Sequence, residues 1–393
     1  MKETFNSIVN AISFKDLTSL KTDDTHINIS AFARWVYKGH PGWVFWDKDT
    51  RERFKGKIVS LYKKANSIKS TDELLKKLYE IVLQTILDRH FSISFKHKRV
   101  LNPKEIKCVK NKIMDDIIVN PKVGRNIAKE DVKTLKKMGI QLYIREDLSN
   151  VGMAWLFVGE IKPNIGIIAC TSLQTGKPPT GEFSQEQFDK LSKMVETVKQ
   201  HYKNWKALIV DLRDNSGGIS SFFGQIASFI NNQDSTDMVQ KLWMRNTPEN
   251  FYTMEKVEFF GKGLLQQLKK RKTPRILCSE AKRKAIHSPP KHIRILMNRL
   301  VASSAEGAIF QFGKCPKYKT VGENTSGCIV GFHPVNISLP NGGIIRISSR
   351  HAILPWKCKE GIGLTPDIPT PNEDAFQVAL KDIQNRFNGK KTK

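Results

Sequence analysis

The N-terminal part of the chain has apolar positions at helical spacing. Between Thr71 and Ile86 they recur every three or four residues, which predicts an amphipathic helix with one buried face. Two weaker patterns of the same kind predict further helices, at 27–37 and 55–64. At 91–95 the pattern changes to strict alternation, Phe-Ser-Ile-Ser-Phe, which predicts a strand. His90 therefore lies where a predicted helix ends and a predicted strand begins. A histidine in this position can also be a structural or surface residue without a catalytic role.

From residue 151 onward the pattern is that of an α/β protein, because short apolar runs alternate with amphipathic helices. The predicted strands are 153–161, 165–171, 207–212, 292–297, 318–322, 329–339 and 343–348. The predicted helices are 184–198, 221–230, 307–312 and 373–388, with part of 251–272. We expect a mixed sheet flanked by helices.

These patterns divide the chain into three predicted parts. Residues 1–95 form an N-terminal helical region that carries His90. Residues 96–160 are lysine-rich and of mixed pattern, with a short helix at 131–137 and a strand at 141–145, and we interpret them as a connecting region. Residues 161–393 form the α/β domain.

A glycine turn stands at the centre of the α/β part. The buried strand Ala207–Leu212 runs into Asp-Asn-Ser-Gly217-Gly218, and Ser220 or Ser221 is placed to cap a following helix. Such a turn directs backbone N–H groups and the positive end of a helix at one point, which suits a phosphate, a carboxylate or an oxyanion. An ordinary strand-to-helix turn has the same local pattern.

A second strand-to-helix junction carries two serines. The strand His292–Met297 is followed by Ser303 and Ser304, and a helix opens at about Gly307. A serine in this position is presented at the end of a sheet, and the helix dipole stabilises negative charge beside it. The alternative is that either serine is a plain helix N-cap.

The charge balance points to acidic partners. The chain carries 65 basic and 38 acidic residues, a formal net charge of +27. Such a field attracts polyanions, acidic membrane surfaces or acidic proteins, although a solvated lysine-rich surface also accounts for it. No recognised nucleic-acid motif accompanies the charge, which argues against nucleic acid as a partner.

The remaining composition favours a globular protein of a reducing compartment. Six cysteines are scattered without paired metal-ligand spacing, so we expect reduced thiols and no metal. No apolar stretch is long enough to be a transmembrane segment. The N-terminus lacks the sustained apolar region of a signal peptide, and we therefore predict a cytoplasmic location.

Four motifs occur in one order along the chain: Asp-Arg-His at 88–90, Asp-Leu-Arg-Asp-Asn-Ser-Gly-Gly at 211–218, Ala-Ser-Ser-Ala-Glu at 302–306, and Glu-Gly-Ile-Gly-Leu-Thr-Pro-Asp-Ile at 360–368. In this order and spacing they resemble the tail-specific (C-terminal-processing) serine proteases and the core of the related tricorn protease. The resemblance covers 161–393 and reaches back to the histidine. It implies the tail-specific protease or crotonase-like fold.

The resemblance also implies roles for individual residues. The nucleophile of the family lies three residues before a glutamate at a helix start, which is Ser303 here, ahead of Glu306. The oxyanion hole of the family uses backbone N–H groups of the double-glycine turn and of the residue after the nucleophile. These are Gly217 or Gly218, and Ser304.

Two departures from the family pattern bear on the mechanism. Cys328 stands where the processing proteases have a catalytic lysine, so a Ser–Lys dyad is not expected; we expect the thiol to be structural. The tricorn-like branch instead uses a histidine and a glutamate, for which His90 and Glu360 are the matching positions. Arg89 stands where that branch has a relay serine. The region 96–160 is also too short and atypical for the PDZ domain common in the family.

We therefore expect a serine-type peptidase that cleaves peptides or proteins through an acyl-enzyme and needs no cofactor. Ser303 is the nucleophile, His90 the general base and Glu360 the orienting group. The first alternative is a catalytically inactive homologue that binds peptides or acts as a scaffold. The second is a basic nucleic-acid-binding protein.

Overall fold

The chain folds into two compact units, each assembled from separate segments. Unit 1 comprises Met1–Asp116, Gln240–Cys278 and Val330–Pro355, and unit 2 comprises Ile117–Val239, Ser279–Ile329 and Trp356–Lys393. The computed structural model describes residues 4–86, 88–95, 98–99, 120–147, 155–161, 164–171, 185–218, 226, 230, 241–245, 247–256, 275–278, 290–312, 318–329, 331–353 and 358–389. The predicted caps Ser220 and Ser221 lie outside these residues, as does most of the predicted helix 221–230.

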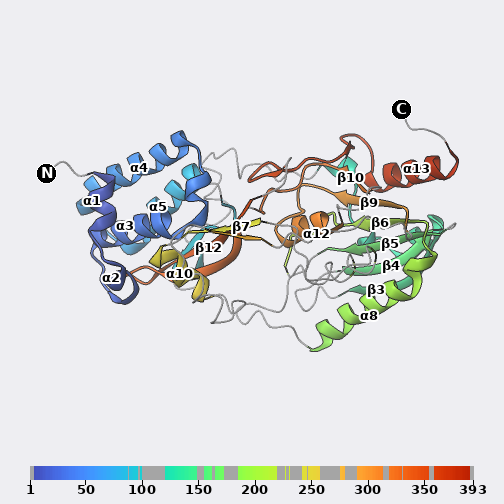
Figure 1. Ribbon diagram of the computed structural model, residues 1–393, viewed down its shortest axis with the longest axis horizontal. Helices are drawn as coiled ribbons and strands as arrows, with labels where there is room; N and C mark the ends of the chain where they lie inside the picture. Colours follow the sequence, from blue (N-terminus) through green and yellow to red (C-terminus); the bar gives the residue numbers. More distant parts are fainter. Residues whose placement is uncertain are drawn as a thin grey trace. The chain divides into compact units, whose positions relative to one another are not determined.

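Unit 1 is rich in helices, drawn mostly in blue in Figure 1. Its α-helices are α1 (Phe5–Asn10), α2 (Phe14–Ser19), α3 (Thr25–Arg34), α4 (Lys48–Lys63), α5 (Thr71–Thr85) and α10 (Pro248–Glu255). Its shorter turns are the π-helical η1 (Trp35–Gly39) and the 3₁₀ segments η2 (Pro41–Phe45) and η3 (Ala65–Ser67). Helix α5 confirms the strongest helical prediction: Ser70 caps it by accepting from the N–H of Glu73, and its apolar stripe is buried.

The sheet of unit 1 joins strands from distant parts of the sequence. Its strands are β1 (Ser92–Phe95), β2 (Lys98–Arg99), β7 (Lys241–Met244), β8 (Arg275–Cys278), β11 (Gly331–Ser338) and β12 (Gly343–Ile353). The order is β2-β1-β12-β7-β8, with β11 also paired to β12. Strand β1 runs antiparallel to β12, with Ser92 opposite Arg346 and Ile93 opposite Ile345. Ile93, Ile345 and Ile347 belong to the same apolar core as the helices, so the sheet and helices of this unit form one packed body.

Unit 2 is built on a seven-stranded mixed sheet. Its strands are β3 (Ile140–Asp147), β4 (Trp155–Ile161), β5 (Ile165–Cys170), β6 (Ala207–Asp211), β9 (His292–Met297), β10 (Tyr318–Gly322) and β15 (Ile368–Pro369). The order is β15-β10-β9-β6-β5-β4-β3; β3, β4 and β5 pair antiparallel, and the pairs from β5 to β15 are parallel. A small antiparallel ribbon joins β13 (Cys358–Lys359) to β14 (Gly363–Leu364).

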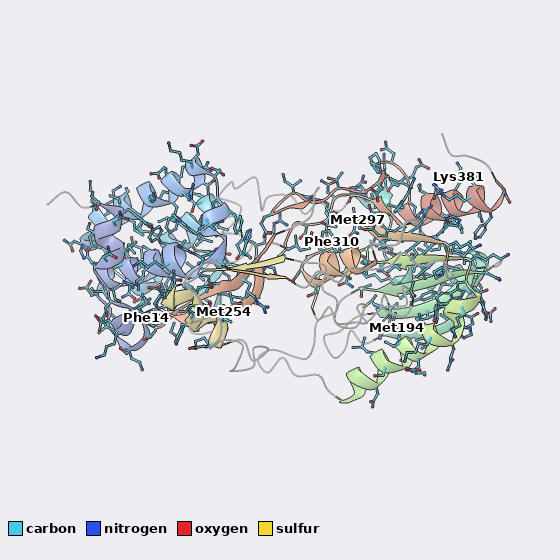
Figure 2. All side chains as sticks on the ribbon, in the orientation of Figure 1. Phe14, Met194, Met254, Met297, Phe310 and Lys381 are labelled. Carbon is cyan, nitrogen blue, oxygen red and sulfur yellow. The ribbon has the colours of Figure 1, made fainter. Side chains whose placement is uncertain are left out.

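Helices cover both faces of this sheet. The α-helices are α7 (Val132–Lys137), α8 (Gln185–His201), α12 (Ser304–Phe312) and α13 (Ala375–Phe387), and the 3₁₀ turns are η4 (Pro121–Val123), η5 (Ile127–Lys129) and η7 (Tyr202–Asn204). One face packs on α8 and α12, and the labelled side chains Met194, Met297 and Phe310 in Figure 2 belong to this core. The other face packs on α7 and α13. Because both faces are buried, every residue of β6 is buried and the strand reads as a continuous apolar run.

The fold class predicted from the sequence is confirmed, and the division of the chain is more interwoven than the three consecutive parts that the patterns suggested. Strand β3 and all of β4 lie before residue 162, yet they extend the sheet of unit 2. Strands β7, β8, β11 and β12 lie inside 161–393, yet they join the N-terminal helices in unit 1. Helix α10 covers only Pro248–Glu255 of the partly helical region expected at 251–272, whose remainder from 257 lies outside the described residues. In the described part of the chain, no helix has the length and apolar character to cross a membrane.

Candidate active site

The two predicted turns meet at one edge of the unit 2 sheet. Strands β6 and β9 are parallel neighbours, so the segments that follow them emerge side by side at their carboxyl ends. Backbone hydrogen bonds join these segments directly: the N–H of Leu212 donates to Leu296 O at 3.0 Å, and the N–H of Ala302 donates to Asn215 O at 3.0 Å. The glycine turn and the serine turn therefore form one local structure.

Asn215 holds the glycine turn in shape. Its buried amide donates to the carbonyl of Cys170 at the end of β5 (2.9 Å), and its Oδ1 accepts from the N–H of Gly217 (3.0 Å). Gly217 has a φ of 94°, and a Cβ there would lie 2.6 Å from Ala302 O and 2.8 Å from the Cβ of Ser303. Only glycine allows the turn to come this close to the serine. The Gly217 N–H is therefore used within the turn itself, by Asn215.

Ser303 has an uncommon backbone conformation. It occupies the turn between β9 and α12 with a φ of 55°, in the left-handed region that a residue with a Cβ adopts at a cost of about 1–3 kcal/mol. A strained strand-to-helix turn of this kind exposes a nucleophilic serine at the top of a sheet in other hydrolases. Ser303 is partly exposed in the structure.

Ser304 connects the two turns through its side chain. Its hydroxyl donates a hydrogen bond to the carbonyl of Gly218, so the side chain ties the start of α12 to the glycine turn. A hydroxyl used in this way serves to close the turn. The choice between Ser303 and Ser304 as the reactive serine stays a prediction from the sequence.

A buried carboxylate organises the nucleophile turn from beneath. Glu306 is fully buried on the first turn of α12. Its Oε2 accepts the N–H groups of Ser303 and Cys328, both at 2.9 Å, and its Oε1 accepts the hydroxyl of Thr325 and the N–H of Gly327. Burial raises the pKa of this carboxyl, although its hydrogen bonds act in the opposite direction. In the sequence, Glu306 only helped to locate Ser303 three residues before it. In the structure, its carboxylate accepts hydrogen bonds from both the Ser303 turn and the loop that carries Cys328.

Glu360 lies beside the same loop. Its Oε2 accepts the N–H of Ile329 at 3.3 Å, and the N–H of the following Gly361 donates to Gly327 O at 2.8 Å. The loop from Gly327 to Ile329 therefore contacts both Glu306 and Glu360. Unit 2 thus brings together the predicted residues Gly217, Gly218, Ser303, Ser304 and Glu360 in one connected region.

We expect Glu306→Gln to lower the free energy of unfolding by about 2–4 kcal/mol. Each carboxylate oxygen accepts from two donors, and the amide NH₂ of glutamine would face one of these pairs with a further donor. Urea unfolding at pH 7 measures the loss. The matched control is Glu373→Gln at an exposed position, for which we expect a change within about 0.5 kcal/mol. Equal effects of the two substitutions would contradict this role of Glu306.

His90 lies in unit 1, within a compact polar cluster. Asp88, whose side chain is 1% exposed, accepts the backbone N–H of His90 on Oδ1 at 2.8 Å. Its Oδ2 lies 2.9 Å from Nε2 of His40 and accepts the hydroxyl of Ser348 at 2.6 Å. Burial acts to raise the pKa of Asp88, but hydrogen bonds from His40 and His90 hold it well below its usual range. The carboxylate is therefore ionised at neutral pH.

His351, on β12 of the same unit, is expected to make the protein acid-sensitive. It is buried face to face against Phe45, with ring centroids 4.3 Å apart, and burial, together with nearby His40, lowers its pKa to about 3. Because the unfolded chain binds this proton at about pH 6.5, stability is lost as pH falls from about 6.5 towards 3. This amounts to about 3 kcal/mol between pH 7 and pH 4.

His351→Phe removes this titration and keeps an aromatic ring against Phe45. We expect urea unfolding of the variant to lose about 3 kcal/mol less than the wild type between pH 7 and pH 4. His26→Phe, at a half-exposed histidine that contacts Tyr62, should keep the wild-type pH dependence. Asp88 still contributes a loss below about pH 4 in all three proteins. A wild-type slope in His351→Phe would contradict the prediction.

A serine at a strand-to-helix turn, a glycine turn beside it and a layered α/β fold are features of serine hydrolases that present their nucleophile between a strand and a helix. The comparison with protein families gives the particular family. The family model for peptidase family S41 matches residues 164–370, more than half of the chain, and the protein belongs to this family of serine peptidases. Its predicted kinship with the tail-specific proteases is confirmed.

Solved structures support the same fold. A candidate peptidase from Parabacteroides merdae is 16% identical, with a TM-score of 0.54, and the match covers 94% of this chain and all of that one. Mature CPAF is 12% identical, with a TM-score of 0.52, and the match covers 94% of this chain and 99% of that one. At these identities the likeness concerns the fold. No curated protein sequence matches the chain.

Several residues that contact the Ser303 turn or surround Asp88 were not predicted from the sequence. Asn215 and Glu306 lay inside recognised motifs, but their buried contacts were not predicted. His40 and Ser348, which both contact Asp88, were not among the predicted site residues. A carboxylate two residues before His90 was the available signal for Asp88, because Asp at that spacing accepts the N–H two residues on.

Proposed function

We propose that this protein is an active serine peptidase that hydrolyses peptide bonds through an acyl-enzyme at Ser303, with His90 as the general base. The observation that carries the proposal is the conformation of Ser303: a non-glycine residue at φ 55°, in contact with the glycine turn and held by Glu306. Strain of this kind at a strand-to-helix serine serves a reactive hydroxyl better than a plain helix cap.

The proposed reaction proceeds in two steps. In the first, the Ser303 oxygen bonds to the carbonyl carbon of the peptide while His90 takes the hydroxyl proton, and His90 then returns a proton to the leaving amine. In the second, a water molecule gives a proton to His90 and its oxygen bonds to the acyl carbon. The bond to the Ser303 oxygen then breaks, His90 returns the proton to Ser303, and the acid is released. The N–H groups of Gly218 and Ser304 are the proposed donors to the oxyanion, each contributing on the order of 3 kcal/mol. The sequence match assigns the orienting role to Glu360.

Three features support an active enzyme over an inactive scaffold. The close approach of Gly217, the engagement of Asn215 and the buried Glu306 each constrain the Ser303 turn. A peptide-binding scaffold would not need this constraint. The departures at Cys328 and Arg89 are compatible with a histidine base, because neither position supplies the proposed nucleophile or base.

A fluorophosphonate probe tests the proposal directly. We expect the full-length protein to be labelled once per chain at neutral pH, with the adduct located on Ser303 by mass spectrometry of the digested protein. Prior heat denaturation should abolish labelling, because the reaction depends on the folded site. Absence of labelling in the native protein would favour the inactive homologue. A mobility shift of a nucleic acid that weakens steeply with salt would support the nucleic-acid alternative instead.

A further inference from the structure

We propose that Asp88 is the positioning residue of the base: it holds the tautomer of His90 in which Nδ1 carries the proton and Nε2 is left to accept one. The inference deepens the proposed function and rests on it. It assigns to a residue of unit 1 the orienting role that the sequence match gave to Glu360. The argument depends only on contacts within unit 1.

Asp88 is a buried acceptor surrounded by donors. Oδ1 accepts the His90 N–H, and Oδ2 accepts the Ser348 hydroxyl, with His40 Nε2 at 2.9 Å from the same oxygen. A Cβ at Gly331 would lie 2.5 Å from Oδ1, so the backbone also closes tightly over the carboxylate. These contacts fix the carboxylate in position before any substrate binds.

The tautomer of His40 follows from its second ring nitrogen. The N–H of Gly42 donates to Nδ1 of His40 at 3.0 Å, so Nδ1 is an acceptor and carries no proton. Nε2 therefore carries the proton and donates it to Asp88. In this arrangement both ring nitrogens of His40 are engaged, Nδ1 by the N–H of Gly42 and Nε2 by Asp88.

Among the histidines around Asp88, His90 is the one placed to serve as the base. His351 is held neutral by burial and packs face to face with Phe45, and Nε2 of His40 faces Asp88 itself. Nδ1 of His90 lies 3.6 Å from Oδ1 of Asp88, and its side chain is 13% exposed, against 1% for Asp88. With Nδ1 turned to the carboxylate, Nε2 is the nitrogen that Asp88 does not engage. A proton taken at Nε2 then produces an imidazolium that the fixed carboxylate stabilises.

Asp88→Asn is a sharp test because the two carboxylate oxygens both face donors. An asparagine has one oxygen and one NH₂ group, so it cannot accept on both sides. If the oxygen stays with His40 and Ser348, the NH₂ faces His90 and favours an acceptor at Nδ1. His90 then carries its proton on Nε2, which is the wrong tautomer for a base.

The experiment uses full-length protein with ¹⁵N-labelled histidine side chains. Two-dimensional ¹⁵N–¹H spectra above pH 8 report which ring nitrogen carries the proton, and His90→Gln identifies the signal. We expect His90 to be the Nδ1–H tautomer in the wild type and in Glu360→Gln, and to lose that tautomer in Asp88→Asn. The fluorophosphonate labelling rate should fall about 10²- to 10⁴-fold in Asp88→Asn.

Ser348→Ala is the matched variant for folding, because it removes one donor to Asp88 and keeps the carboxylate. We expect it to retain the Nδ1–H tautomer and to label within about tenfold of the wild type. The Ser348→Ala variant keeps the proposal testable if Asp88→Asn does not fold. If His90 carries its proton on Nε2 in the wild type or in Ser348→Ala, the proposal is overturned. A tautomer change in Glu360→Gln also overturns it. If His90→Ala is labelled at the wild-type rate, the proposed function is overturned instead. This labelling rate is measured independently of the tautomer.

Discussion

Ser303→Ala is expected to abolish fluorophosphonate labelling and to lower cleavage of unfolded casein by at least about 10³-fold. Alanine removes the oxygen that forms the acyl-enzyme, while the backbone hydrogen bond from residue 303 to Glu306 remains possible. The fold should therefore survive. Rates of casein cleavage and labelling measure the loss, and the urea midpoint checks the fold.

Ser304→Ala is the matched control, one residue along the same turn. It removes the hydroxyl that ties α12 to Gly218, but the proposed oxyanion donor at position 304 is a backbone N–H and is kept. We expect labelling to persist and casein cleavage to fall by no more than about tenfold. Labelling that survives in Ser303→Ala and disappears in Ser304→Ala would reverse the assignment of the nucleophile.

His90→Ala is expected to lower casein cleavage by about 10²- to 10⁴-fold, which is the usual contribution of general-base catalysis. The backbone N–H at position 90 still donates to Asp88, so the turn itself is retained.

His26→Ala is the control for the loss of a histidine from unit 1. The ring of His26 contacts Tyr62, and His26 is not among the residues that contact Asp88. Its loss should therefore leave cleavage unchanged. The full chain is needed for these measurements, because strands β3 and β4 lie before residue 162 and both units combine distant segments. Cleavage by His90→Ala at the wild-type rate would remove His90 from the mechanism.

The sequence by itself determined the local elements and the two strand-to-helix turns that carry the glycines and the serines. Strand β10 has the predicted bounds Tyr318–Gly322, and α5 begins at the predicted Thr71, because runs of β-branched residues and amphipathic stripes depend on nearby residues alone. The glycine turn and the Ser303 turn were predictable for the same reason. Each follows a buried strand directly, and parallel strands place such turns at one edge.

Only the tertiary structure decided which distant segments pair and which polar groups meet. The alternation in 91–95 predicted a strand, but periodicity shows which face is buried and not which strand lies beside it, so its pairing with β12 was not foreseen. Ser348, which donates a hydrogen bond to Asp88, lies on the same strand β12. Asp88 and Glu306 are each the centre of a hydrogen-bonded cluster, because a buried carboxylate needs protein donors in place of water. Only the fold decides which donors lie within reach.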